Sequence, residues 1–252
     1  MASHVHLPEL PYSKRPLPKN VAAEILSETS TSEPKLHEYF RRLLAAHGPQ
    51  HWWPGRTRFE VIVGAILTQN TAWVNVEQAL SKLRQKKLLT PAAIKTVPPA
   101  RLARLIRSSG YFRQKTKTLK AFVQFLRTQY AGSLSEMFTA PTELLREQLL
   151  GVRGIGPETA DSILLYAGNR PVFVVDAYAR RILERHQLAQ AKLSYEEIRN
   201  FLEANLPQDA SLYNEFHALI VRTGKEYCRK ENPRCSECPL RPFLPEATQP
   251  LL

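Results

Sequence analysis

The chain has 252 residues, a formal net charge of +12 at pH 7 and a sequence pI near 9.8. This charge favours an anionic partner, and no apolar run is long enough to span a membrane or to form the core of a signal peptide. Three cysteines give no balanced disulfide framework, so we expect a cytoplasmic protein.

The first third of the chain moves from an irregular arm into helices. Residues 1–31 hold four prolines and no sustained hydrophobic period, which predicts a disordered or loosely docked arm. From Ser32 the pattern is helical, with Ser32 as a plausible cap. Residues 59–67 repeat apolar side chains at helical spacing and predict a buried helix. In the polar run that follows, Thr71 would cap the next helix.

Two adjacent tryptophans, Trp52 and Trp53, lie in a loop that Pro54 and Gly55 close. Large aromatic side chains in a loop often plug a core from outside. They can also serve as a stacking platform for a nucleic-acid base, because every base has a π face. Both interpretations stay open at this point.

Amphipathic helices dominate the rest of the chain. Along residues 115–130 the pattern buries leucine and phenylalanine and is expected to point Lys115, Lys117 and Lys120 outward. His217 lies beside the apolar face of a helix over residues 211–224 and is predicted to be a half-buried packing residue. Positive charge is dispersed among acids along the chain. No segment alternates convincingly as a strand, so we predict an all-α protein without internal repeats.

A glycine-rich turn separates two helical patterns in the middle of the chain. The pattern of residues 142–150 ends at Gly151, and Pro157 opens the next helix. Between them, Gly154 and Gly156 can take positive φ and let the backbone approach a partner closely. A helix start preceded by such a turn is an anion site, and in a basic protein the anion favoured is a nucleic-acid phosphate.

Just beyond this hairpin, the apolar run of residues 171–175 ends in Asp176, at the start of a helix over residues 177–186. An Asp in this place is commonly a helix cap. Hairpin and carboxylate together, G-I-G-x-x-T-A followed by V-D, resemble the helix-hairpin-helix DNA glycosylase superfamily, the relatives of endonuclease III. The resemblance implies that Asp176 is the catalytic carboxylate in a base-binding pocket.

The same resemblance implies contacts with DNA. The hairpin would grip one strand through backbone amides, and the matching positions are Val152, Gly154, Ile155, Gly156 and Thr159. Gln69 matches a glutamine that enters the duplex and fills the gap left by the extruded base. We therefore expect double-stranded DNA with damaged bases as the partner of a monomer associated with the nucleoid.

Three further motifs, W-W-P, L-T-Q-N-T and S-G-Y-F-x-Q-K, look like the bacterial 3-methyladenine DNA glycosylase III type. The substrate-binding residues this implies are Trp52, Trp53, Pro54, Gln69, Glu158 and Tyr178. Glu158 stands where bifunctional relatives have a lysine whose amine attacks the sugar and permits strand cleavage. A glutamate has no such chemistry, so we expect a monofunctional enzyme without efficient AP-lyase activity.

The fold implied is a two-domain, all-α helix-hairpin-helix glycosylase. Residues 56–170 would form a helical barrel, and residues 32–55 with 171–252 the second domain, with the pocket between them. The function expected is excision of alkylated purines, 3-methyladenine first, by base flipping. Two alternatives stay open: an endonuclease III-like pyrimidine or mismatch glycosylase with AP-lyase activity, and a non-catalytic DNA-binding or damage-sensing module.

The cysteines match a metal loop of the family incompletely. Cys228, Cys235 and Cys238 have the first three spacings of a C-x6-C-x2-C-x5-C iron-sulfur loop, and Leu244 occupies the fourth position. A [4Fe-4S] cluster normally takes four thiolates. A cluster with one other ligand or an open iron, a zinc site completed by a histidine, and a loop without metal all stay open.

Overall fold

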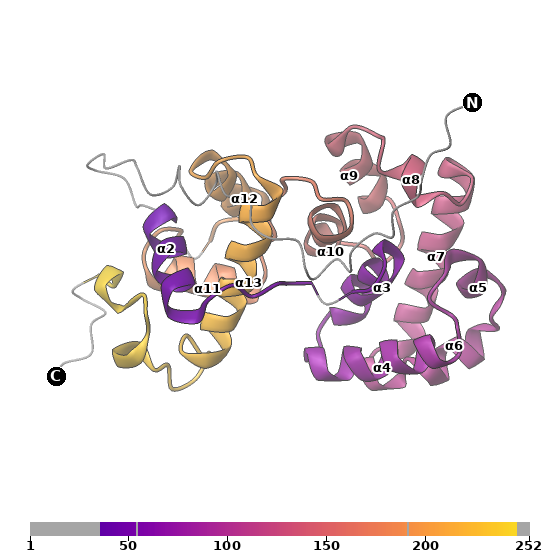
Figure 1. Ribbon diagram of the computed structural model, residues 1–252, viewed down its shortest axis with the longest axis horizontal. Coiled ribbons are helices and arrows are strands. Elements are labelled where there is room, and N and C mark those ends of the chain that lie inside the picture. The colour runs from indigo at the N-terminus through magenta and orange to yellow at the C-terminus, as the bar shows by residue number, and fades with distance from the viewer. Residues whose placement is uncertain (1–35, 54, 191, 246–252) are drawn as a thin grey trace, which may run out of the picture. The chain divides into compact units, whose positions relative to one another are not determined.

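The computed structural model describes residues 36–53, 55–190 and 192–245, so the arm predicted for residues 1–31 lies outside the described residues. All regular structure in these three ranges is helical, without a strand, which confirms the all-α prediction (Figure 1). Across the same ranges, no helix combines the length and apolar character needed to cross a membrane. The described chain packs into two compact units.

Within the described chain, the first unit comprises residues 53, 55–139 and 152–154. Its helical elements are α3 (Arg58–Thr68), α4 (Trp73–Gln85), α5 (Pro91–Thr96), α6 (Pro99–Leu105), η2 (Arg107–Ser109), α7 (Phe112–Tyr130) and α8 (Leu134–Met137). Helix α3 packs against α4 and α7, and α5, α6 and α8 also pack on α7 (Figure 1). Every residue from 59 to 67 is buried, as the apolar spacing predicted.

The start of α4 differs from the prediction. Ala72 is the N-cap residue of this helix and makes no side-chain cap hydrogen bond. The Thr71 hydroxyl instead accepts a hydrogen bond from the Asn75 amide at 3.2 Å. The predicted Thr71 cap is therefore wrong, because the helix begins one residue later than a Thr71 cap requires.

Lys115 is the clearest departure from the predicted helix faces. Its side chain was expected to point outward, but the residue is 2% exposed. The ammonium donates to the carbonyl oxygens of Leu67 at 2.9 Å and Ser109 at 2.6 Å. Carbonyls in the last turn of a helix lack intrahelical donors, so a buried lysine can satisfy them. Burial lowers the pKa of Lys115 to about 8.

The second unit comprises residues 36–52, 140–151 and 155–245 of the described chain. Its helical elements are α2 (Leu36–His47), α9 (Thr142–Leu150), α10 (Pro157–Ser162), the π-helical turn η3 (Ile163–Ala167), α11 (Ala177–Arg185), α12 (Tyr195–Ala204), α13 (Ala210–Glu226), η4 (Cys235–Glu237) and η5 (Arg241–Phe243). Helix α13 is the centre of this unit and packs against α2, α11 and η3. Ser32, the predicted cap of the helix that became α2, lies outside the described residues.

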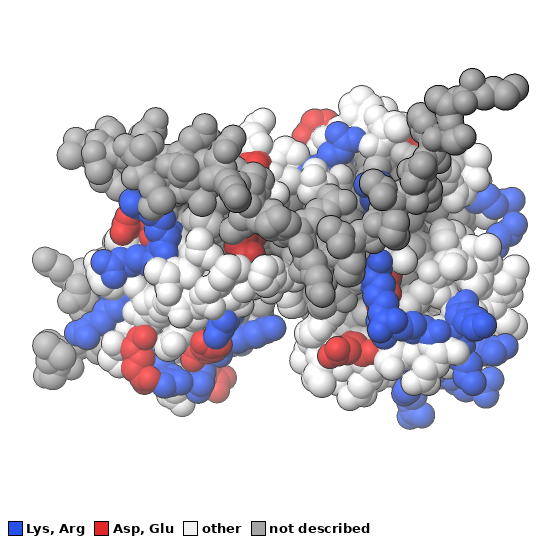
Figure 2. Space-filling view, in the orientation of Figure 1, with Lys and Arg blue, Asp and Glu red and all other residues white. Residues whose placement is uncertain are grey.

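The two units differ sharply in charge. Residues 53–139 and 152–154 contain 16 Lys and Arg against 3 Asp and Glu. The described residues of the second unit contain 15 of each sign. Figure 2 shows the same excess of basic side chains on the part of the visible face that α4 to α7 form. The charge that looked dispersed along the sequence is therefore concentrated in one unit.

Candidate functional site

Asp176 is the N-cap residue of α11, and its carboxylate is held on one oxygen. Oδ1 accepts hydrogen bonds from the backbone amides of Tyr178 at 2.9 Å and Ala179 at 2.8 Å. The side chain is 15% exposed. Capping therefore occupies Oδ1 and leaves Oδ2 for other interactions. A helix cap and a functional carboxylate are compatible at this position.

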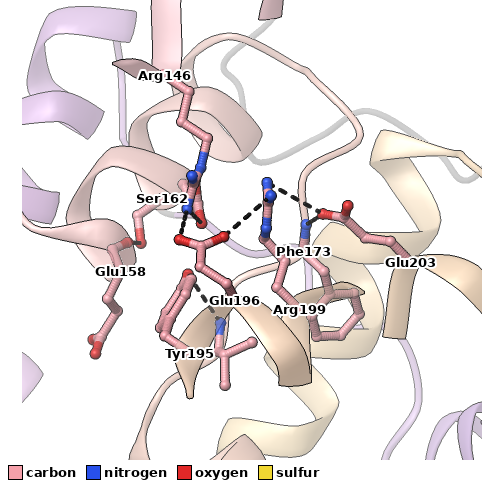
Figure 3. Close-up of polar contacts among 10 residues, drawn as sticks. Arg146, Glu158, Ser162, Phe173, Tyr195, Glu196, Arg199 and Glu203 are labelled. Carbon is pink, nitrogen blue, oxygen red and sulfur yellow. Dashed lines mark hydrogen bonds and ion pairs between the residues drawn. The ribbon is translucent and has the colours of Figure 1, made fainter. Parts of the chain in front are cut away.

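The extended segment before Asp176 is anchored by side chains of α12. Residues 172–175 are buried, so their backbone amides need partners although no strand lies beside them. The amide of Phe173 donates to Glu203 at 2.8 Å, and that of Val175 donates to the Tyr195 hydroxyl at 3.3 Å (Figure 3). These bonds fix the backbone that delivers Asp176 to its helix.

An ion-pair network ties this anchor to the hairpin helices. Arg146 of α9 binds Asp161 of α10 through two bonds of 2.6 and 3.1 Å, and Asp161 is fully buried. Arg146 also donates to Glu196 at 2.6 Å, which pairs with Arg199 at 3.2 Å (Figure 3). Tyr195 also interacts with Asp161 and lowers the pKa of its carboxyl. Burial raises the pKa of Asp161, although Arg146 opposes this shift.

Glu158 lies in the first turn of α10, as predicted, where the helix dipole favours a carboxylate. Its side chain extends away from the Arg146 network (Figure 3). The residue reaches solvent, yet desolvation by surrounding atoms and, next, the like charge of Asp176 raise its pKa to about 7. The structure thus brings Glu158 and Asp176 within electrostatic reach of each other.

Sequence reasoning did not foresee the place of His217. The residue is 5% exposed, and its Nε2 lies 3.8 Å from Asp176 Oδ2. Its Nδ1 is hydrogen-bonded to the hydroxyl of Tyr166, which is fully buried. Because His217 lies 41 positions beyond Asp176, no spacing rule could have paired them. Only the packing of α11 and η3 on α13 does so.

The tryptophan pair divides between two environments. Trp53, in the first unit, is 5% exposed and packs edge-on against Trp73 and over Gly64. Trp52, in the second unit, is partly exposed. Trp52 therefore offers accessible ring surface where Trp53 fills a core. Pro54 lies outside the described residues.

Tyr178, the remaining residue predicted for the substrate site, is fitted against α13. Its ring lies over Gly224, where an added Cβ would come within 2.4 Å of it. The Arg181 guanidinium lies over the same ring, with its carbon 5.1 Å from the ring centroid. These contacts fix the ring in place.

The hairpin exposes backbone and buries side chains. Val152 and Ile155 are 6% and 5% exposed, and Thr159 is buried as well. Gly154 and Gly156 are exposed, and Gly154 has φ +89°, a conformation that favours glycine. A partner at this turn would therefore meet main-chain groups.

Gln69 and the hairpin turn come together within the first unit. The Gln69 side-chain amide donates to the carbonyl oxygen of Gly154 at 3.0 Å. Two motifs separated by 85 positions thus share one surface. Tyr111, which the sequence analysis did not single out, is a 72% exposed aromatic side chain of the same unit in the left-handed region at φ +43°.

The family follows from comparison with known proteins. Residues 63–208 match the model of the HhH-GPD superfamily base excision DNA repair proteins, which is more than half of the chain. The chain belongs to this superfamily. The predicted resemblance to helix-hairpin-helix, endonuclease III-like proteins is thereby confirmed, and the chain is a base excision DNA repair protein of HhH-GPD type.

Individual relatives agree with this assignment. The HhH-GPD chain is 45% identical over 210 residues to “Putative DNA repair glycosylase MJ1434” of Methanocaldococcus jannaschii, covering 82% of this chain and 94% of that protein. It is 30% identical to the endonuclease III of Thermotoga maritima, covering 73% and 80%. A solved structure of the H. pylori 3-methyladenine DNA glycosylase MagIII bound to 1,N6-ethenoadenine matches with TM-score 0.65 and 30% identity, covering 75% and 96%.

A four-thiolate iron-sulfur cluster does not fit this HhH-GPD chain. Leu244 occupies the fourth position and is buried at 8% exposure, and the sequence has no cysteine besides Cys228, Cys235 and Cys238. Within the described ranges no group of three or more His, Cys, Asp or Glu is arranged to hold a metal ion. Arg185 instead donates to the Cys228 sulfur at 3.3 Å and to a loop carbonyl at 2.7 Å.

Proposed function

We propose that the protein is a monofunctional DNA N-glycosylase that removes alkylated purines, 3-methyladenine first, from duplex DNA and leaves an abasic site. The observation that carries this proposal is the Asp176 carboxylate, held by two helix amides with Oδ2 free of the cap and with Glu158 as its charged neighbour. Membership of the superfamily supplies the reaction class.

The chemistry asked of Asp176 follows from the substrate. An adenine methylated at N3 is cationic, so its glycosidic bond is weakened and the base leaves neutral without a general acid. The enzyme must stabilise the positive charge that develops on the sugar and activate a water. A carboxylate in a water-poor site can do both, by electrostatic stabilisation and as a general base. Fixing Oδ1 on the helix amides keeps Oδ2 in one orientation for this work.

Glu158 supports the monofunctional assignment. Strand cleavage by a bifunctional glycosylase needs an amine that forms a Schiff base with C1′. A carboxyl group at position 158 cannot form one. Because the pKa of Glu158 is raised to about 7, this group is also partly neutral at physiological pH and places less negative charge beside Asp176.

Binding of the DNA is assigned to backbone and charge. The exposed Gly154 and Gly156 would present amides to a phosphate, and Val152, Ile155 and Thr159 would contribute main-chain contacts because their side chains are buried. Gln69, tied to Gly154, would enter the duplex at the extruded base. The sixteen basic residues in the described part of the first unit provide the sequence-independent attraction to phosphates.

Selectivity for a cationic base is assigned to Trp52. A cation over an indole face gains roughly 0.5 to 2 kcal/mol, depending on desolvation. Trp52 is the accessible member of the tryptophan pair, and Tyr178, which belongs to the same unit, would line the base-binding site with it. The MagIII structure, which is bound to 1,N6-ethenoadenine, supports a modified adenine as the class of base.

One rival function is favoured by a specific observation. The 30% identity to an endonuclease III supports a glycosylase of that kind with AP-lyase activity. Borohydride trapping on DNA with an abasic site distinguishes the two, because only a Schiff-base intermediate is reduced to a stable covalent complex. We expect no trapped complex with this protein and a trapped complex with an authentic endonuclease III.

The direct test is release of base from alkylated DNA. The protein is incubated with duplex DNA treated with a methylating agent, and released bases are separated by chromatography. We expect 3-methyladenine in the soluble fraction and intact strands until the abasic sites are cleaved with alkali. Absence of any released methylated base, with full binding to the same DNA, would leave only the non-catalytic DNA-binding module.

A further inference from the structure

We propose that His217 is a positioning residue for Asp176, and that its hydrogen bond with the Tyr166 hydroxyl fixes its tautomer. The inference rests on the proposed function only in that it takes Asp176 as the reacting carboxylate. The geometry itself lies wholly within the second unit.

The polarity of the hydrogen bond between Tyr166 and His217 follows from what lies on the other side of the imidazole. A carboxylate oxygen can only accept, so the ring nitrogen that faces Asp176 Oδ2 is the one best placed to carry the N–H. A neutral imidazole has one donor and one acceptor nitrogen. Nδ1 is then the acceptor, and the Tyr166 hydroxyl donates its hydrogen to it.

The hydrogen bond from Tyr166 to Nδ1 determines which nitrogen of the His217 ring carries the proton. Burial lowers the pKa of His217, and the Asp176 carboxylate offsets only part of this shift, so the imidazole is neutral at pH 7. With Nδ1 accepting from Tyr166, the one ring proton is on Nε2. That nitrogen is buried and has no other hydrogen-bond partner within the described residues. The N–H therefore faces Asp176 Oδ2.

The separation of 3.8 Å between Nε2 and Oδ2 is longer than a hydrogen bond. Catalytic hydrogen bonds are often long in the free enzyme and tighten in the substrate complex. Even at this distance, an N–H dipole directed at a carboxylate in a poorly solvated site favours the anionic form. His217 would thus hold Oδ2 in orientation and favour the anion that the reaction requires.

The local backbone is shaped for this contact. Tyr166 lies in η3, where the chain leaves the α-helical hydrogen-bond pattern of α10 for a wider π-helical turn. The wider turn changes the direction in which the following side chains point, and such turns recur at functional sites. The Phe173 ring, packed edge-on at 6.4 Å, closes another side of His217.

Other titratable groups near this pair are few. Glu158 of α10 and Tyr166 of η3 interact with Asp176, whose negative charge raises the pKa of each. On α2, the other helix packed on α13, His47 faces Thr223 and Glu226. Among the charged groups of the described residues, Asp176 is the one whose charge acts on His217.

The test measures the titration of the Asp176 carboxyl in the free protein by carbon-13 NMR, assigned with Asp176→Asn. Removing the donor in His217→Leu is expected to raise the titration midpoint by about one pH unit, the size of a hydrogen bond to a charged group. His217→Gln, whose side-chain amide can donate to Oδ2, is expected to stay near the parent midpoint. Tyr166→Phe, which frees the tautomer, is expected to fall between them.

The same variants are compared in single-turnover base release across pH, with thermal unfolding as the control for folding. If His217 positions Asp176, the acidic limb of the pH–rate profile of each variant moves to higher pH together with its NMR midpoint. An unchanged midpoint in both His217→Leu and Tyr166→Phe would overturn the proposal, as would a midpoint in His217→Gln equal to that of His217→Leu. Should His217→Leu not fold, the Gln and Phe variants decide. Failure of the parent to release base would sink the proposed function alone, because the NMR titration needs no turnover.

Discussion

Replacing Arg146 by Met is the most informative perturbation of the frame that holds Asp176. The substitution keeps an apolar stem of similar length but removes three hydrogen bonds, two to Asp161 and one to Glu196. Asp161 is fully buried and keeps only Tyr195 and the more distant charge of Arg199. Breaking one side of a buried ion pair costs about 3 to 5 kcal/mol.

Because these partners remain, we expect the free energy of unfolding to fall by about 3 kcal/mol, near the lower end of that range. At roughly 2 to 4 °C per kcal/mol for a chain of this size, Tm should fall by about 6 to 12 °C. The sign of the pH dependence follows from Asp161. Without Arg146 its folded-state pKa rises further above the unfolded value, so the native state holds the proton longer than the unfolded chain. Stability is then lost as pH rises through that window, and the variant should be more destabilised at pH 8 than at pH 5.

The assay is calorimetry or thermal unfolding at both pH values, with two matched variants. Arg234→Met removes an exposed pair with Glu237 and should leave Tm within error. Arg146→Met combined with Asp161→Leu removes both buried charges and should recover most of the lost stability. An Arg146→Met protein that unfolds together with the Arg234→Met control, or whose deficit is the same at both pH values, would refute the reasoning.

Three other expectations concern single positions. Gly154→Ala should destabilise the protein by about 3 kcal/mol or more and weaken DNA binding, because at φ +89° the new Cβ would come within 2.2 Å of the Thr118 hydroxyl. The control Gly132→Ala, at a position with positive φ and open space, should lose only about 1 to 2 kcal/mol in denaturant unfolding. Equal losses in the two variants would contradict this prediction. The pKa of Lys115, about 8 in the folded protein, means that the native state releases its proton before the unfolded chain, so stability contributed by this group rises with pH. Relative to Lys115→Met, the parent should gain about 2 kcal/mol between pH 7 and 9.5, and a constant difference would rule the shift out. Trp52→Ala should slow release of 3-methyladenine by roughly 2- to 30-fold, from the loss of a cation–π contact, while release of a neutral substrate base changes less; equal losses would argue against a charge-selective role.

Local patterns in the sequence were enough to predict the helices and the hairpin. Apolar spacing identified α3, and the glycines with Pro157 identified the turn before α10, because both signals are contained within one or two helical turns. The same reasoning placed Lys115 on the wrong face. Its burial depends on the carbonyl of Leu67 at the end of α3, 48 positions away, together with that of Ser109 at the end of η2.

The candidate site was predicted only where a motif carried it. Asp176 and Glu158 were named from the hairpin pattern, and the interaction between their charges became visible in the folded chain. His217 could not be paired with Asp176 in advance, because a single histidine beside an apolar helix face carries no signal about its neighbours. The concentration of positive charge in one unit was hidden for a similar reason, since the sequence does not state which residues pack together.

The central claim is that the Asp176 carboxylate carries out base release. Asp176→Asn retains the shape of the side chain and an oxygen that can accept from the amides of Tyr178 and Ala179. In single-turnover reactions on DNA that contains 3-methyladenine, we expect this variant to release base at least about a hundredfold more slowly than the parent. Its affinity for the same DNA should stay near that of the parent. Release at the parental rate by a folded, DNA-bound Asp176→Asn protein would contradict the account.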